Sequence, residues 1–381
     1  MRTLFVPNVD GRVDYPNTVH FSNVPAIIRV RYSENYDSAS DVVTVTAAFG
    51  DSKVYTEDRV VHELSATFDI RRFLQSVFDG INIDTVDYNA GMWIDNPNFQ
   101  KVNVVVSSKR ASDEIHILHT FSTDAIFGNI ERGESTGGNI RRRWFVNYPF
   151  TLDFFAKEGE MLSVVVDGVD RPGVSFPNHT SSNDVDFSSG FSRVLLNVSK
   201  LVDPLTIDKR IRIVQPFGYV TKNDEESIGL VAYDLDVDRS PADCEKGVYL
   251  RWIDNQGRFC YWLFKDLGTS DAVTGTSWNA AEIRNPLLYD GAINIGTDIR
   301  QSFSRTKTRN LGAKSVDREI FDFLLTLVSS PFVDVFDGYD ADNIPQWHRV
   351  NVSPGTVAKS TKSRQDFTVA IVEPTQLTQS L

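Results

Sequence analysis

Apolar and polar residues alternate with a period of two along much of the chain. The clearest examples are residues 41–47, 101–106 and 161–166, each bounded by polar or glycine-containing segments. Successive side chains of a β-strand point to opposite faces of a sheet, so this alternation predicts strands with one buried face. Many short strands separated by turns are typical of antiparallel sandwiches or barrels and not of a nucleotide-binding α/β fold.

Two segments show helical spacing instead. Asp69 stands at an N-cap position before an apolar stripe within residues 70–78, and Gly80 follows as a stop signal. A second stripe begins near Ser315 and ends before Pro331, which cannot continue a helix. The predicted fold class is therefore mainly β, with two antiparallel β-sandwich or barrel-like domains, each with a short covering helix.

The length of the chain predicts more than one domain. Its 381 residues exceed what one hydrophobic core usually organises. The composition around residues 200–204 indicates a domain boundary, because a new series of strands begins at residues 210–214. We therefore predict an N-terminal β-rich domain over residues 1–203 and a C-terminal β-rich domain over residues 204–381.

Charge and cysteine content limit the classes of partner. The 39 basic and 51 acidic residues give a net charge of -12, which disfavours nucleic-acid binding. The dense cationic cluster at residues 141–143 is interpreted as a solvated strand end in preference to a phosphate site. Cys244 and Cys260 cannot form a disulfide framework, and no signal peptide or membrane-spanning run is evident. We expect synthesis in a bacterial cytoplasm and no membrane partner.

One acidic segment resembles a calcium-binding loop. Asp234, Asp236 and Asp238 alternate, and Glu245 occupies the twelfth position counted from Asp234. However, Arg239 occupies the sixth position, where such a loop needs glycine for its sharp bend. An acidic strand end is the favoured interpretation.

The other candidate ligands and catalytic groups do not form a recognisable site. Residues 334–342 contain a second acidic cluster, interpreted as a solvated loop. His116 and His119 are three residues apart, which on a strand places them on opposite faces. No phosphate-binding loop or His-Glu-x-x-His pair is present. We therefore predict no enzyme, and no catalytic, cofactor-binding or metal-binding residues.

The most distinctive passage, residues 247–264, predicts a β-hairpin. Residues 254–257 suit a tight turn in which Gly257 has positive φ. Its aromatic residues allow two interpretations, a packed core or a platform on which sugars or bases stack. The core is favoured, because exposing all of the rings would create a large apolar patch. The rings are those of Tyr249, Trp252, Phe259, Tyr261 and Trp262.

This hairpin, YLRWIDNQGRFCYWLF, resembles a Leu-Arg-Trp-Ile-Asn-x-x-Gly-Gly-aromatic hairpin of uncharacterised tail-region proteins of phages and prophages from gut bacteria. Arg258 departs from the pattern, which often has a second glycine there. Residues 66–70 are similar to part of the first domain of those proteins. Residues 314–333 and 347–352 are similar to their closing section, in which a final strand would correspond to residues 365–373.

The resemblance implies a non-enzymatic structural protein of the virion, in the distal tail or baseplate, and supplies no catalytic residues. Its partners would be other phage structural proteins, with a homo-oligomeric ring as the expected assembly. The loops predicted at residues 129–139 and 178–192 would become ordered at subunit contacts. The alternative is a carbohydrate-binding or adhesion β-sandwich module. A third possibility is a glycoside hydrolase-like enzyme, since paired carboxylates come together only in the fold.

Overall fold

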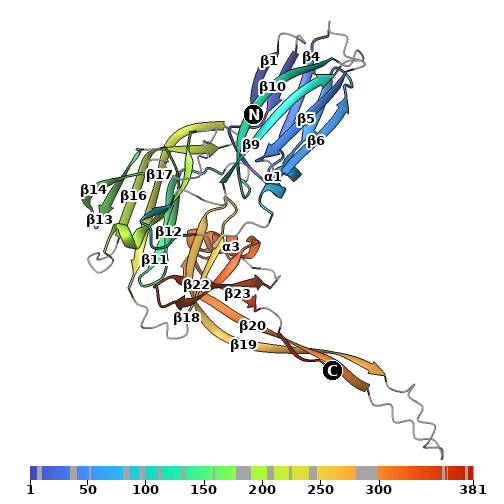
Figure 1. Cartoon of the computed structure of the whole chain (residues 1–381). Coiled ribbons are helices and arrows are strands. Elements are labelled where there is room, and N and C mark those ends of the chain that lie inside the picture. The colour runs from blue at the N-terminus through green and yellow to red at the C-terminus, as the bar shows by residue number, and fades with distance from the viewer. Residues whose placement is uncertain are drawn as a thin grey trace, which may run out of the picture. The chain divides into compact units, whose positions relative to one another are not determined.

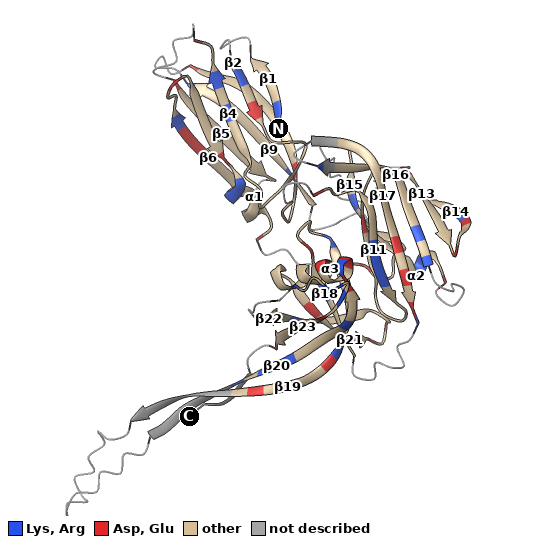
Figure 2. Ribbon diagram, turned by 180° about the vertical axis from the view of Figure 1, so that it is seen from behind, with Lys and Arg blue, Asp and Glu red and all other residues tan. Residues whose placement is uncertain are grey.

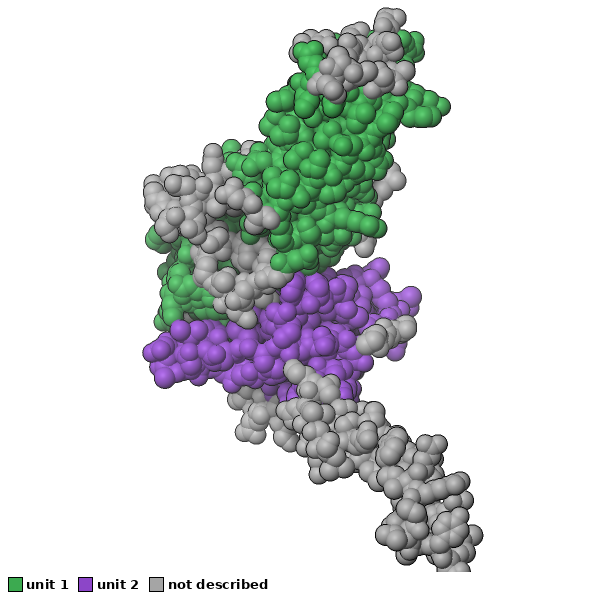
Figure 3. All heavy atoms as spheres, turned by 45° about the vertical axis from the view of Figure 1, so that its right-hand side comes forward, with its two compact units in different colours: residues 1–241, 253–260 green, residues 242–252, 261–381 purple. Residues whose placement is uncertain are grey.

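The computed structural model is mainly β (Figure 1), which confirms the predicted fold class. It forms two compact units (Figure 3), one of residues 1–241 with 253–260 and one of residues 242–252 with 261–381. The structure describes residues 1–6, 11–34, 41–50, 53–79, 86–93, 99–109, 114–130, 134–157, 159–176, 190–203, 210–222, 225–239, 247–279, 298–353, 357, 359–373 and 376–380.

The first unit begins with a sandwich of two sheets. One sheet has the order β1-β2-β4-β7 and the other β3-β10-β9-β5-β6. Alternate residues of both sheets are buried in a shared apolar core, as the period-two pattern predicts. The strands are β1 (Arg2–Val6), β2 (Gly11–Tyr15), β3 (Val19–Phe21), β4 (Ile27–Tyr32), β5 (Val42–Phe49), β6 (Lys53–Val60), β7 (Ser65–Asp69), β9 (Phe99–Lys109) and β10 (Ile115–Ile126).

Helix α1 (Arg71–Val77) covers this sandwich core with Phe73, Leu74 and Val77. Its N-cap residue is Ile70 and not the predicted Asp69. The Asp69 carboxylate still accepts a hydrogen bond from the Arg71 N–H at 3.0 Å, which satisfies a free donor of the first turn. The predicted stop at Gly80 lies outside the described residues.

Two further sheets face each other in the same unit, with the orders β11-β17-β16-β13-β14 and β12-β15-β8. Phe154 of β12 contacts Tyr233 of β17 between them, with ring centroids 5.2 Å apart. The elements are β8 (Met92–Trp93), β11 (Gly138–Phe145), β12 (Thr151–Ala156), β13 (Met161–Val166), β14 (Val169–Ser175), β15 (Ser192–Asn197), helix α2 (Val198–Leu201), β16 (Arg210–Lys222) and β17 (Glu225–Asp238).

Two features of this unit differ from the simplest sequence interpretation. The pairs β3–β10 and β11–β17 are parallel, so two of its sheets are mixed and not purely antiparallel. Strand β16 pairs with both β13 and β17, which places residues 210–238 in the first unit. The domain boundary predicted near residue 203 therefore falls inside this unit.

The second unit is built on one sheet with the order β19-β18-β21-β22-β23-β20-β24. Because β19 also pairs with β20, the strands from β19 to β20 close into a barrel. The elements are β18 (Gly247–Ile253), β19 (Phe259–Asn279), β20 (Asp298–Asp317), helix α3 (Arg318–Ser329), β21 (Val333–Tyr339), β22 (Pro345–Val352), β23 (Arg364–Val372) and β24 (Gln376–Ser380).

Helix α3 covers the core of this second unit. It begins after the N-cap residue Asp317, whose carboxylate accepts from the Ile320 N–H at 2.9 Å, and it ends before Pro331 as predicted. Its apolar stripe is buried, and Phe321 contacts Phe367 of β23 at 5.5 Å between ring centroids. The predicted closing strand corresponds to β23, although β24 follows it.

Strands β19 and β20 continue beyond the barrel as a long ribbon (Figure 1). Their pairing extends from Lys265 opposite Gly312 to Asn279 opposite Asp298. Strand β24 joins the ribbon by pairing with residues 302–305 of β20. This ribbon is called the arm below, and side chains are described for its residues 265–272 and 305–312.

Candidate functional site

The aromatic rings of the central hairpin are buried, so the core interpretation is confirmed. Within the second unit, Trp252 donates its indole N–H to Thr326 Oγ1 of α3 at 2.9 Å and contacts the ring of Phe323. Tyr249 stacks on Tyr261 at 6.1 Å on the strand face that carries odd-numbered residues. The five rings considered as a stacking platform are at most 5% exposed. The hairpin therefore leaves no open aromatic surface for a sugar or a base.

The second acidic cluster is partly buried, which corrects the expectation of a solvated loop. Asp334 is 2% exposed and accepts from Arg251 Nη2 at 2.7 Å and from the Arg349 guanidinium. Sequence inspection missed this site because Arg251 lies 83 residues away in the chain. Asp337 pairs with His348 at 2.7 Å, as an exposed contact.

The arginine cluster of β11 and the calcium-like aspartates of β17 form one ladder of ion pairs. Parallel pairing sets the two strands side by side, and basic and acidic bands lie next to each other in Figure 2. The pairs are Arg141–Asp236 at 2.6 Å, Arg143–Asp238 at 3.7 Å and, from β16, Arg212–Asp234 at 3.1 Å. These groups neutralise one another, while Glu245 lies outside the described residues.

The histidines of β10 lie apart. His116 contacts Glu114 at 3.6 Å, whereas His119 packs against Tyr15 and Phe121. Burial lowers the pKa of His119, and the charge of Arg2 lowers it further. In the described ranges, no group of three or more His, Cys, Asp or Glu side chains could hold a metal ion. None of the described helices is both long and apolar enough to span a bilayer.

The hairpin turn is fixed by its own side chains. The Asp254 carboxylate accepts from the N–H groups of Gln256 and Arg258, each at 2.9 Å, and Gly257 has a φ of +74° as predicted. Arg258, which departs from the tail-protein pattern, is buried and hydrogen-bonds Tyr233. The turn therefore closes without a second glycine.

A buried ion pair holds this turn within the first unit. Arg193 Nε donates to Asp153 Oδ1 at 2.8 Å, and Arg193 Nη2 donates to the Gly257 carbonyl at 2.6 Å. The Phe259 N–H donates to Asp153 Oδ2 at 2.8 Å. Burial raises the pKa of Asp153, although Arg193 and the Phe259 N–H oppose that effect. Cys260, next in the chain, is a buried free thiol whose pKa burial raises well above its ordinary value.

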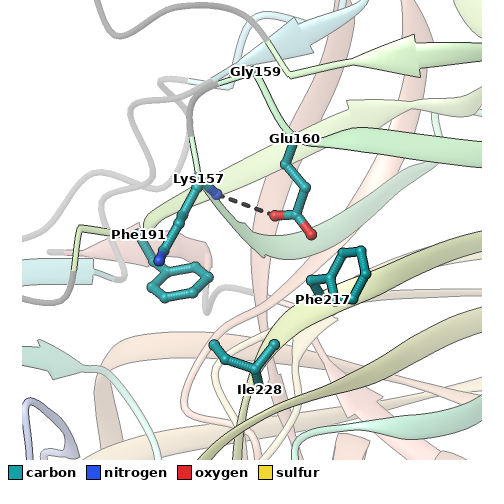
Figure 4. Close-up of a pocket in the computed structure, with 6 residues that line it drawn as sticks. All are labelled: Lys157, Gly159, Glu160, Phe191, Phe217 and Ile228. Atoms are coloured by element: carbon teal, nitrogen blue, oxygen red, sulfur yellow. Dashed lines mark hydrogen bonds between the residues drawn. The ribbon is translucent and has the colours of Figure 1, made fainter.

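A pocket of about 310 Å³ opens in the first unit (Figure 4). It lies where the β12–β13 connection, the segment before β15, and strands β16 and β17 meet. Strand β16 has a bulge between Gln215 and Gly218, and Phe217 within it is 67% exposed. The lining residues are Lys157, Gly159, Glu160, Phe191, Phe217 and Ile228.

Glu160 is the acidic group of the pocket. Its Oε2 accepts from Gln215 Nε2 at 2.9 Å and from the Lys157 N–H at 3.2 Å, the contact drawn in Figure 4. Its Oε1 is buried and has no hydrogen-bond partner among the described residues. Lys157 Nζ lies 4.8 Å from the centre of the Phe191 ring. The pocket thus combines an acceptor, a donor and aromatic surface.

Sequence reasoning did not single out these pocket residues. They come from four separate segments, and the one local signal is the Pro-Phe-Gly sequence that interrupts alternation at residues 216–218. The loop predicted at residues 129–139 contains the start of β11, and its residues 131–133 lie outside the described chain. Most of the second predicted loop, its residues 178–189, also lies outside the described chain.

Comparisons with known proteins assign no family. No protein-family model and no curated protein matches the chain. Fibronectin(III)-like modules of Clostridium thermocellum CbhA are 8% identical, with 60% of this chain and 94% of that chain covered and a TM-score of 0.18. The ICAM-5 D1–D4 ectodomain fragment is 9% identical, with coverage of 91% and 74% and a TM-score of 0.21. Extracellular domains 3–5 of Drosophila OTK are 11% identical, with coverage of 78% and 90% and a TM-score of 0.17. TM-scores this low support no functional argument.

Proposed function

We propose that this chain is a non-enzymatic structural component of a phage tail or baseplate that acts by binding other virion proteins. The resemblance of the central hairpin to phage tail-region proteins supports this role. The structural observation that carries the proposal is the arm. Its length, exposure and free strand edge are properties that assembly with neighbouring subunits would use.

The arm has little to bury within its own unit. Side chains of β19 from Leu267 to Ala272 are exposed on both faces of the ribbon. A two-stranded hairpin alone is marginally stable in water, because neither face packs on a core. Beyond the barrel, β19 has β20 as its one pairing partner within the described chain. Its other edge therefore presents backbone donors and acceptors to a further strand.

Ion pairs along the arm hold its strands together. Arg305 of β20 contacts Asp271 of β19 at 2.7 Å, and Arg309 of β20 contacts Asp266 of β19 at 3.9 Å. The Arg305 and Asp271 side chains are 50% and 37% exposed, so solvent screens their attraction. Such pairs set the register of the ribbon but give it little stability. A neighbouring subunit, most simply another copy in a ring, would supply the missing contacts.

The ion pairs formed by the acidic residues support a non-enzymatic role. In each acidic cluster that drew attention in the sequence, an aspartate is paired with an arginine, Asp334 with Arg251 and Asp236 with Arg141. Their carboxylates serve as structural partners.

Mass spectrometry of purified phage particles from the host of this gene, with electron microscopy of the same particles, tests the virion role. We expect the chain in intact particles, with antibody labelling at the tail. Its absence from particles would remove the proposal.

The role of the arm can be tested separately with the purified protein. Replacement of residues 274–304 by Asn-Gly would join the paired residues Val273 and Arg305 through a two-residue turn. We expect an unchanged thermal unfolding midpoint but a smaller assembly by light scattering. Assembly equal to that of the intact chain would show that the arm is not the subunit contact.

A further inference from the structure

We propose that the pocket of Figure 4 binds one sugar ring of a glycan. This inference does not depend on the role in a phage tail, because the pocket belongs to the first unit and the arm to the second. The size of the pocket, its hydrogen-bonding groups and its aromatic surface each suit such a ligand.

The size of the pocket suits a small ligand. Its volume of about 310 Å³ lies at the lower end of the roughly 300–1,000 Å³ that is usual for small-molecule sites. Both Lys157 and Phe217 are exposed at its rim. A ring at the end or on a branch of a glycan could therefore enter while the rest of the chain stays in solvent.

Glu160 is positioned to accept a hydrogen bond from such a ligand. Gln215 is fully buried and holds the carboxylate by donating to Oε2, while it also donates to the Phe155 carbonyl at 2.6 Å. Oε1 lacks a donor among the described residues although it is buried. A ligand hydroxyl could bond Oε1 only if the carboxylate turned toward the pocket, and that bond would then supply the donor that the buried acceptor lacks.

The aromatic surface suits the apolar face of a pyranose. Phe217 is 67% exposed, an unusual position for a phenylalanine. The C–H groups on one face of a sugar ring would cover it and remove apolar surface from water. Lys157 Nζ, above the Phe191 ring, could then donate to a hydroxyl or to the ring oxygen.

The two charges of the pocket favour a neutral ligand with many hydroxyl groups. An ionised Glu160 only accepts hydrogen bonds and Lys157 only donates them, whereas a hydroxyl does both. A ligand with a single charge of either sign would be attracted by one of these two groups and repelled by the other, so the pocket selects neither an anion nor a cation.

Saturation-transfer difference NMR on the full chain tests the proposal. The probes are the methyl glycosides of glucose, galactose, mannose and N-acetylglucosamine, with free glycine and glutamate as non-sugar probes. We expect at least one glycoside to receive saturation, with a Kd on the order of 1 mM, and neither amino acid to do so. Phe217→Ala and Glu160→Gln should each weaken that binding about tenfold or more.

Phe5→Ala is the matched control, because Phe5 lies in the same unit and is 61% exposed. It should bind the glycoside as the unmodified chain does. Circular dichroism confirms that each variant is folded, and Glu160→Gln preserves the shape of the pocket. The proposal is overturned if no glycoside receives saturation, if binding survives both pocket substitutions, or if the amino acids bind in preference to the sugars.

Discussion

Arg193 and Asp153 form an ion pair that is shut off from solvent, with Arg193 Nε 2.8 Å from Asp153 Oδ1 and side-chain exposures of 0% and 3%. The pair joins β15 to β12, and Arg193 also holds the carbonyl of Gly257. Two strands and the hairpin turn thus share one buried charged group.

Removal of one partner of the Arg193–Asp153 ion pair should lower the stability of the protein. Arg193→Met leaves the Asp153 carboxylate buried without its cation, and we expect the free energy of unfolding to fall by about 3–5 kcal/mol. Urea denaturation followed by fluorescence measures the change. The double variant Arg193→Met with Asp153→Leu should recover part of the loss, since no unpaired charge remains. A single variant as stable as the unmodified protein would contradict the structural role of the pair.

Gly257 should not tolerate a side chain. A Cβ at this position would lie 2.0 Å from the Phe127 carbonyl oxygen, and its φ of +74° already disfavours other residues. Gly168 has a similar φ of +83° but open space around it, so Gly168→Ala is the matched control. We expect Gly168→Ala to cost about 1–2 kcal/mol from the backbone alone. Gly257→Ala should cost about 1–3 kcal/mol more because of the clash. Equal thermal unfolding midpoints for the two variants would count against the packing described.

Trp252 should act as a core residue. Its ring is fully buried against Phe323 and its indole N–H is bonded to Thr326. Trp252→Ala should therefore lower the free energy of unfolding by about 3–5 kcal/mol. Chemical denaturation measures the loss, and the exposed Phe5→Ala provides the comparison. Full stability after Trp252→Ala would revive the idea of an exposed stacking platform.

His119 should make stability depend on pH. Burial holds the pKa of the folded-state imidazole below its ordinary value of 6.5, so the unfolded chain binds this proton first as pH falls. The stability that the neutral His119 imidazole contributes is present above pH 6.5 and is lost as the pH drops through the folded-state pKa. His119→Phe keeps the packing against Tyr15 and Phe121 but removes the titration. Between pH 7.5 and 5.5, the free energy of unfolding should fall less for the variant than for the unmodified protein, as measured by denaturation at each pH. Equal falls for the two proteins would exclude a contribution from His119.

Local patterns predicted much of the fold. Alternation located β5, β9 and β13, apolar stripes located α1 and α3, and the Asp254–Gly257 turn was recognisable because its backbone needs a glycine. These features depend on neighbours in the chain, so they are visible in a single sequence. The burial of the hairpin rings followed from the size of the patch that they would otherwise expose.

Features set by distant partners could not be predicted. Asp334 looked solvated because nothing close in sequence identifies Arg251 as its partner. The parallel pairing of β11 with β17 joins segments about 95 residues apart, and the ion-pair ladder follows from that pairing. The pocket likewise depends on a bulge that sets the direction of Phe217. Each of these depends on topology, which a hydrophobic period does not encode.

Closure of the barrel through β19 and β20 limits where another copy of the chain could add a strand to this sheet. Where those strands meet, near Lys265 and Gly312, β19 and β20 are each paired on both sides, so an incoming strand finds no template at that point. Further along, the same two strands separate from the circle and keep one side of β19 open within the described chain. The arm is therefore a locus at which another strand could be added, and its orientation in the unit would set the direction in which a chain of copies could lengthen.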